Sequence, residues 1–175
     1  MTHAETKHTL ELATPSDREI VMTRVFDAPR GTVFDAFTTP ELISQWLLGP
    51  DGWSMPVCDV DLRVGGTFRY VWRNDADGRE FGLAGVYHEI MRPARILHSE
   101  KFEEPWYPGE ARITSIFREQ NGSTTFTMTI LFESPEARDT ALESGMERGV
   151  SASYDRLSNL FDRTTAPASS SSAHL

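Results

Sequence analysis

Turn-forming residues recur between Met55 and Phe132 at the spacing of β-hairpins, and this pattern constrains the fold more than any other feature of the chain. Glycine, proline and asparagine favour tight turns, and they cluster at 64–66, 74–78, 92–94, 106–109 and 120–122. The segments between these turns predict six strands, over residues 56–63, 66–73, 79–91, 95–103, 110–119 and 123–132. Such short connections leave no room for crossover helices, so the predicted sheet is antiparallel.

Apolar residues recur at every second position in several of these segments. Because alternate side chains of a strand point to one face of the sheet, we expect three sets to face the interior: Phe68, Tyr70 and Trp72; Ile113, Ser115 and Phe117; and Phe126, Met128, Ile130 and Phe132.

The chain before these strands predicts one further strand and two short helices. Residues 18–27 are rich in β-branched and apolar side chains, which favour a strand. Val33, Phe34 and Phe37 share one face of a helix, and a second helix restarts at Pro40.

A long amphipathic segment follows the last strand. Ser134 and Pro135 form a helix-start signature, and apolar residues then repeat at helical spacing at Leu142, Met146, Val150, Tyr154 (or Ser153), Leu157, Leu160 and Phe161. Its single apolar face and that of the sheet are each other's only large partners. The sequence therefore predicts an α+β domain, with a curved antiparallel sheet of about seven strands wrapped around one long C-terminal helix.

The two ends of the chain differ from this middle part. Residues 1–17 are polar and aperiodic, and residues 163–175 are mostly Ala, Ser and Thr, so we expect disordered tails on either side of one domain over residues 18–162. No segment has the apolar core of a secretory signal or the roughly 20 apolar residues of a membrane helix. We expect a cytoplasmic protein without a membrane span.

Charge and cysteine content exclude several kinds of partner. The formal net charge is -9, and the 17 Lys and Arg residues are scattered, so a nucleic acid backbone would be repelled. Cys58 is the single cysteine, which we interpret as a small core residue and not a nucleophile. No phosphate loop, dinucleotide fingerprint, nucleophile elbow or zinc spacing occurs, so we expect no cofactor and no metal.

The order of motifs resembles the START-like superfamily of helix-grip proteins, also called SRPBCC, which includes the Bet v 1-like and polyketide cyclase-like proteins. The closer likeness is to its branch similar to the activator of heat shock protein ATPase. The residues that carry it span about 18–161: Arg24–Arg30, Val33–Phe37, Thr39–Leu42, Gln45–Trp46, Gly49–Pro50, Val64–Phe68, Gly85, Glu89–Ile90, Gly149 and Tyr154–Leu157. The resemblance implies a cavity between the sheet and the long helix. Leu47, Leu48 and Val150 depart from the aromatic residues common in the family, which implies a differently shaped pocket.

Large aromatic side chains are more numerous than one small core requires, and rings around a curved sheet favour an apolar ligand site with a few polar groups. Together with the resemblance they predict a ligand-binding set: Trp46, Trp53, Phe68, Tyr70, Trp72, Phe81, His98, Phe102, Trp106, Phe117, Phe126, Met128, Met146, Val150 and Tyr154. The alternative is that these side chains fill the core completely. Gly145 and Gly149, predicted inside the long helix, indicate either a thin helix wall beside a ligand or close helix packing.

Acid-base chemistry has three candidate residues, His98, Glu100 and Tyr70. Glu100 shares the strand parity of His98 and can be an inward acid beside an imidazole, although a surface ion pair is the more frequent arrangement. If the hairpin is centred on Pro93, His88 faces His98; a register shifted by one residue places them on opposite faces.

Three functions follow as hypotheses. The first is a binding module for a small hydrophobic or aromatic molecule, and the second is a cyclase or hydrolase that uses polar groups in the same cavity, although no recognised catalytic motif supports an enzyme. The third is a co-chaperone, which the acidic sequence without a docking stripe does not favour. The sequence does not decide between a monomer and a homodimer.

Overall fold

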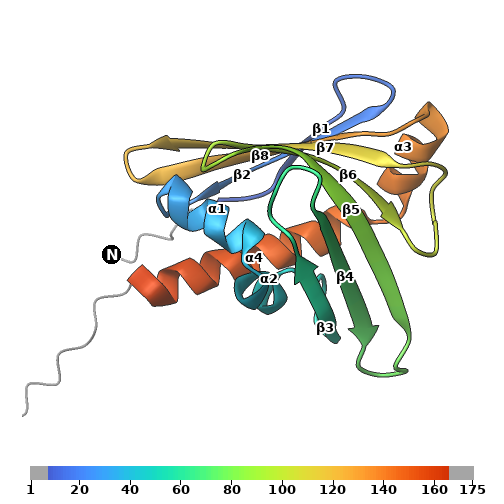
Figure 1. The fold of residues 1–175 in the computed structure, drawn as a ribbon, viewed down its shortest axis with the longest axis horizontal. Coiled ribbons are helices and arrows are strands. Elements are labelled where there is room, and N and C mark those ends of the chain that lie inside the picture. Colours follow the sequence, from blue (N-terminus) through green and yellow to red (C-terminus); the bar gives the residue numbers. More distant parts are fainter. Residues whose placement is uncertain (1–7, 166–175) are drawn as a thin grey trace, which may run out of the picture.

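The structure is a computed structural model, and it describes residues 8–165 (Figure 1). Its strands are β1 (Glu11–Ala13), β2 (Glu19–Phe26), β3 (Trp53–Val60), β4 (Thr67–Asn74), β5 (Glu80–Met91), β6 (Arg95–Phe102), β7 (Ala111–Gln120) and β8 (Ser123–Leu131). Its helices are α1 (Arg30–Thr38), α2 (Pro40–Trp46), α3 (Pro135–Glu143) and α4 (Met146–Thr165).

All eight strands form one antiparallel sheet in the order β1-β2-β8-β7-β6-β5-β4-β3. The strands from β3 to β8 pair in the order of the chain. β2 pairs with β8, so β1 and β3 form the two edges of the sheet. Figure 1 shows the sheet curving over α4, with α1 and α2 beside that helix. The predicted α+β class, the antiparallel sheet and the two short helices after the first predicted strand are confirmed.

The sheet has one strand more than predicted. β1 lies within the segment 1–17 that the sequence analysis assigns to a disordered tail, so that prediction is wrong for residues 11–13. The strand pairs with the open edge of β2, where Leu12 lies opposite Met22 and packs against buried side chains. Backbone hydrogen bonds to an unpaired edge can order a short polar segment that has little propensity of its own. Residues 1–7 lie outside the described part.

The predicted long helix is two helices. α3 ends at Glu143 and α4 begins at Met146, with Gly145 between them at a φ of +79°. A residue in the left-handed region cannot continue an α-helix, and glycine adopts that region without a steric penalty. The Ser134 side chain caps the start of α3 by accepting from the Ala137 N–H. α4 continues to Thr165, so the predicted tail is wrong for residues 163–165, and residues 166–175 lie outside the described part.

The core consists of two clusters under the concave side of the sheet. The larger joins β2, β8, α1, α2 and α4 through Phe26, Phe126, Phe34, Trp46 and Tyr154. The smaller lies near α3 and includes Ile20, Ile113, Phe132 and Ala141. Phe102, Met128 and Val150 are only partly buried and touch both clusters. The core is therefore divided beneath the middle of the sheet. None of the helices among residues 8–165 is both long and apolar enough to cross a membrane.

Candidate functional site

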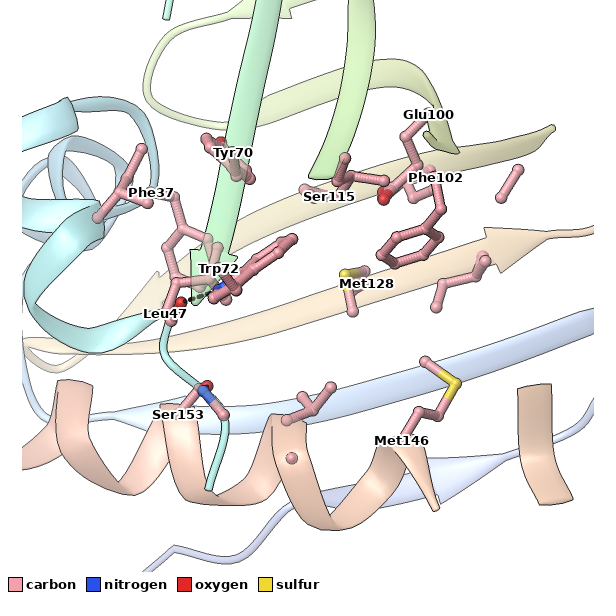
Figure 2. Close-up of a pocket in the computed structure, with 18 of the residues that line it drawn as sticks. Phe37, Leu47, Tyr70, Trp72, Glu100, Phe102, Ser115, Met128, Met146 and Ser153 are labelled. Atoms are coloured by element: carbon pink, nitrogen blue, oxygen red, sulfur yellow. Dashed lines mark hydrogen bonds between the residues drawn. The ribbon is translucent and has the colours of Figure 1, made fainter. Parts of the chain in front are cut away.

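A cavity of about 550 Å³ lies between α4 and the concave face of the sheet. All fifteen residues predicted to bind a ligand line it. Figure 2 shows Tyr70, Trp72, Phe102 and Met128 on the sheet side and Met146 and Ser153 on the helix side. The space is partly open to solvent. Its volume lies within the ~300–1,000 Å³ common for small-molecule sites.

Several lining residues were not in the predicted set. They include Leu47, Leu48, Gly49 and Pro50 after α2, Tyr107 before β7, Tyr87 on β5, Ser115 on β7 and Ser153 on α4, with further aliphatic side chains and Phe37, Phe132 and Ser144 around them. The parity of Ser115 with Ile113 and Phe117 does indicate an inward position. The loop residues carry no periodic pattern, and only the chain path brings them to the cavity.

The segment after α2 is tied to α4 by polar contacts. The Gly49 N–H donates to Ser153 Oγ at 2.8 Å, and Arg156 donates to the Gly49 and Trp46 carbonyl oxygens at 3.1 Å each. On the sheet side, Trp72 Nε1 donates to the Leu47 carbonyl at 2.7 Å, drawn as a dashed line in Figure 2. These bonds hold one wall of the cavity in place.

The wall formed by α4 is thin at Gly149. A Cβ atom at this position would meet only Pro50 Cδ, at 3.7 Å, which is an ordinary contact distance. The helix backbone is therefore not pressed against the sheet here, and of the two interpretations of Gly149 the thin wall agrees with the geometry. Gly145, in contrast, lies at the break between α3 and α4 and not inside a helix.

His98 and Glu100 are the ionisable polar pair of the cavity. His98 Nε2 lies 3.1 Å from Glu100 Oε1, and the two side chains are 16% and 17% exposed. The imidazole meets the ring of Phe68 edge-on at 5.1 Å and lies 6.2 Å from that of Tyr87. Its Nδ1 is buried without a hydrogen-bond partner in the part of the chain that is described. Of the two arrangements considered for Glu100, an inward acid and a surface ion pair, the structure has the inward one.

Tyr70, the third candidate for acid-base chemistry, is buried beside Tyr87. Burial raises the pKa of Tyr70 well above its ordinary value, and the nearby Tyr87, Cys58 and Glu100 raise it further. Burial likewise raises the pKa of Tyr87 to about 12. Both phenols are therefore protonated at neutral pH, where they offer hydroxyl groups and cannot act as bases.

His88 lies on the other face of the sheet from His98. The strand register passes from Tyr87 opposite His98 to Glu89 opposite Leu97, so a bulge at His88 shifts the alternation by one residue. His88 Nε2 lies 2.8 Å from Ser99 Oγ instead. Next to the turn the hairpin is centred on Pro93, with Met91 opposite Arg95, but the bulge shifts the register by one residue from Tyr87 onward, so the two imidazoles do not face each other. Within residues 8–165 no cluster of three or more His, Cys, Asp or Glu can hold a metal ion.

The surroundings of Cys58 agree with its interpretation as a small core residue, because it packs against the larger core cluster. Burial, followed by the charges of Asp59 and Glu41, raises the pKa of its thiol to about 11. Because the thiolate is the nucleophilic form, this environment makes the residue unreactive.

Comparison with solved structures places the fold among bacterial proteins. A protein from Rhodobacter sphaeroides is 29% identical, with a TM-score of 0.83 over 89% of this chain and 99% of that chain. One from Staphylococcus epidermidis is also 29% identical, with a TM-score of 0.74 over 86% and 93%. An Aeromonas hydrophila protein described as AHSA1-like, at 17% identity, a TM-score of 0.67 and coverage of 82% and 94%, shares the fold.

No curated protein matches this sequence. A family model does match, over residues 27–162, and it is described as Activator of Hsp90 ATPase homolog 1-like protein. That stretch runs from the end of β2 to the last turn of α4 and contains every predicted ligand-binding residue. The chain therefore belongs to the Activator of Hsp90 ATPase homolog 1-like family, within the helix-grip superfamily that its sequence motifs resemble.

Proposed function

We propose that this protein binds a small hydrophobic molecule in the cavity between α4 and the sheet. The supporting observation is the cavity itself, about 550 Å³ of space lined largely by aromatic and aliphatic side chains. Protein interiors normally pack to a density near 0.74 with few voids larger than a water molecule. A space of this size with an apolar lining suits an apolar ligand.

A fluorescent hydrophobic probe tests this proposal most directly. Ser115 faces the cavity from β7, and its neighbour Thr114 lies on the other face of the same strand. We expect Ser115→Phe to fill part of the space and weaken binding of the uncharged probe N-phenyl-1-naphthylamine by about tenfold or more, which corresponds to roughly 1.4 kcal/mol. Thr114→Phe adds the same side chain outside the cavity and should leave the affinity unchanged.

Equal binding to both variants would show that the probe sits elsewhere and would remove support for the proposal. Native mass spectrometry of protein purified from its own host supplies the complementary measurement, because a co-purifying compound would identify the natural occupant. Its mass should be lost from the Ser115→Phe protein and kept by Thr114→Phe.

Catalysis on the bound molecule is the second candidate function. The 3.1 Å contact between His98 Nε2 and Glu100 Oε1 supports it, because an imidazole and a carboxylate in contact can move a proton. A bound compound that is chemically changed by the native protein, and equally fast by a protein with both residues substituted, would rule out this pair as the catalyst.

The family description suggests contact with a chaperone as a third function, and this function has less support than ligand binding. The large apolar side chains exposed among the described residues are Val64, Met91 and Trp106, and they do not share one strand or helix. We therefore place it after ligand binding and catalysis.

A further inference from the structure

We propose that the cavity selects apolar ligands whose polar group donates a hydrogen bond, a hydroxyl or an ammonium group, and rejects carboxylates, with Glu100 as the residue that makes the distinction. This inference rests on the proposed function and concerns the polar group of the same ligand. It starts from the charges of the lining. Glu100 and His98 are the only Asp, Glu, His, Lys or Arg side chains among the described residues that line the cavity, so the formal charge there is negative.

Glu100 has room to receive a donor. Its cross-strand neighbours are Gly85 on β5 and Ala111 on β7, and neither has a side chain long enough to cover the carboxylate. His98 is its hydrogen-bond partner within residues 8–165, and that contact uses Oε1. Oε2 has no such partner and is not fully buried, and Glu100 lines the cavity, so this oxygen is available as an acceptor. The accessible charged group of the cavity is therefore a hydrogen-bond acceptor.

His98 cannot reverse this preference by binding an anion. Its Nε2 is engaged with Glu100, and its Nδ1 is enclosed without access to the space. Neither ring nitrogen is free to donate to a ligand carboxylate. The tyrosine hydroxyls and Ser115 are neutral, and they cannot balance a second negative charge beside Glu100.

The negative charge of Glu100 reaches groups on three walls of the cavity. Burial is the main cause of the raised pKa of Tyr70 on β4, Tyr107 before β7 and Tyr154 on α4, and the Glu100 charge raises all three further. At Tyr154 the opposing charge of Arg24 acts in the other direction. An anionic group on a ligand would lie in the same unfavourable potential, because charges interact strongly in surroundings with little water.

Four ligands with the same naphthyl body test the selectivity: methylnaphthalene, naphthylmethanol, naphthylmethylamine and naphthylacetic acid. We expect the alcohol and the amine to bind the native protein at least about tenfold more tightly than the acid, equivalent to roughly 1.4 kcal/mol, by titration calorimetry. In Glu100→Gln the acid should gain about tenfold and the amine lose about tenfold, while methylnaphthalene is unchanged. Glu104→Gln, an exposed loop position with the same change in net charge, should leave all four affinities as they are.

The outcomes separate the two proposals. If none of the four compounds binds, including methylnaphthalene, the proposed function itself is wrong. If all bind with equal affinity, the cavity takes apolar ligands but the donor preference is wrong, and tightest binding of the acid to the native protein overturns it as well. Unchanged ratios in Glu100→Gln, in a protein that still binds methylnaphthalene normally, would remove the assignment to Glu100.

Discussion

Gly85 lies on β5 directly opposite Phe68 of β4, and the ring of Phe68 covers it. A Cβ atom at Gly85 would lie 2.3 Å from Phe68 Cε1 and 2.4 Å from the Ser99 carbonyl oxygen. The first atom belongs to a side chain that lines the cavity, and the second to the backbone of β6. The absence of a side chain at one position therefore places an aromatic ring of the site.

Replacing Gly85 by alanine tests this relation. We expect Gly85→Ala to destabilise the protein by roughly 1–3 kcal/mol, because the ring and a backbone atom must both move to make room for one methyl group. Gly31, where a Cβ meets nothing within 4 Å, provides the control, and Gly31→Ala should not destabilise. Urea unfolding of the two variants measures the difference, and a stability of Gly85→Ala equal to that of the native protein would contradict the argument.

At the scale of elements, the break between α3 and α4 gives the helical layer its shape. α3 packs with the smaller core cluster through Ala137 and Ala141, and α4 carries Tyr154 and Leu157 into the larger one. Gly145 allows the change of direction between them, with the Ser144 side chain accepting from the Met146 N–H at 3.2 Å. The two nearby glycines therefore have different roles.

Replacing each of the two glycines by alanine should change the stability of the protein in opposite directions. Gly145→Ala forces a side chain into the left-handed region at a cost of about 1–2 kcal/mol. Gly149→Ala should instead stabilise α4 by up to about 1 kcal/mol, because alanine is the better helix former and the added atom finds space. Thermal unfolding of both variants measures whether each one is more or less stable than the native protein. A stabilised Gly145→Ala or a destabilised Gly149→Ala would show that these roles are wrong.

At the scale of the whole molecule, four tyrosines line one cavity, and burial raises the pKa of each. Up to the ordinary tyrosine pKa of 10.0, the folded and unfolded chains are both protonated at these sites, so the sites give no pH dependence. Above it the unfolded chain releases protons that the folded chain retains. The unfolded state then gains stability relative to the folded state as pH rises.

We therefore expect the free energy of unfolding to fall as pH rises above about 10, by up to about 1.4 kcal/mol per pH unit for each tyrosine that stays protonated in the folded state. For Tyr87 the loss extends to its folded pKa of about 12. Urea unfolding over this pH range measures the slope, and Tyr87→Phe should make it shallower while leaving the slope near neutral pH unchanged. A slope that Tyr87→Phe does not alter would contradict a protonated, buried Tyr87.

Much of the fold follows from local patterns that act within a few residues. Alternation in Phe68, Tyr70 and Trp72 determines which side chains face the interior, and the parity of His98 with Glu100 predicts their shared face correctly. The turn residues locate all six hairpin strands to within about three residues of their observed ends. Such predictions succeed because side-chain direction in a strand depends on the backbone of that strand alone.

Other features depend on contacts between distant segments. The bulge that places His88 and His98 on opposite faces arises from the pairing of β5 with β6. β1 is ordered by pairing with the edge of β2. Tyr107 reaches the cavity through the path of its loop. The sequence alone determined the type and order of the six hairpin strands and most of their inward faces, because those are set by local backbone and side-chain geometry. Tertiary structure alone decided that a space remains beneath the sheet, because an unfilled volume depends on the curvature of every strand and the fit of all the side chains around it.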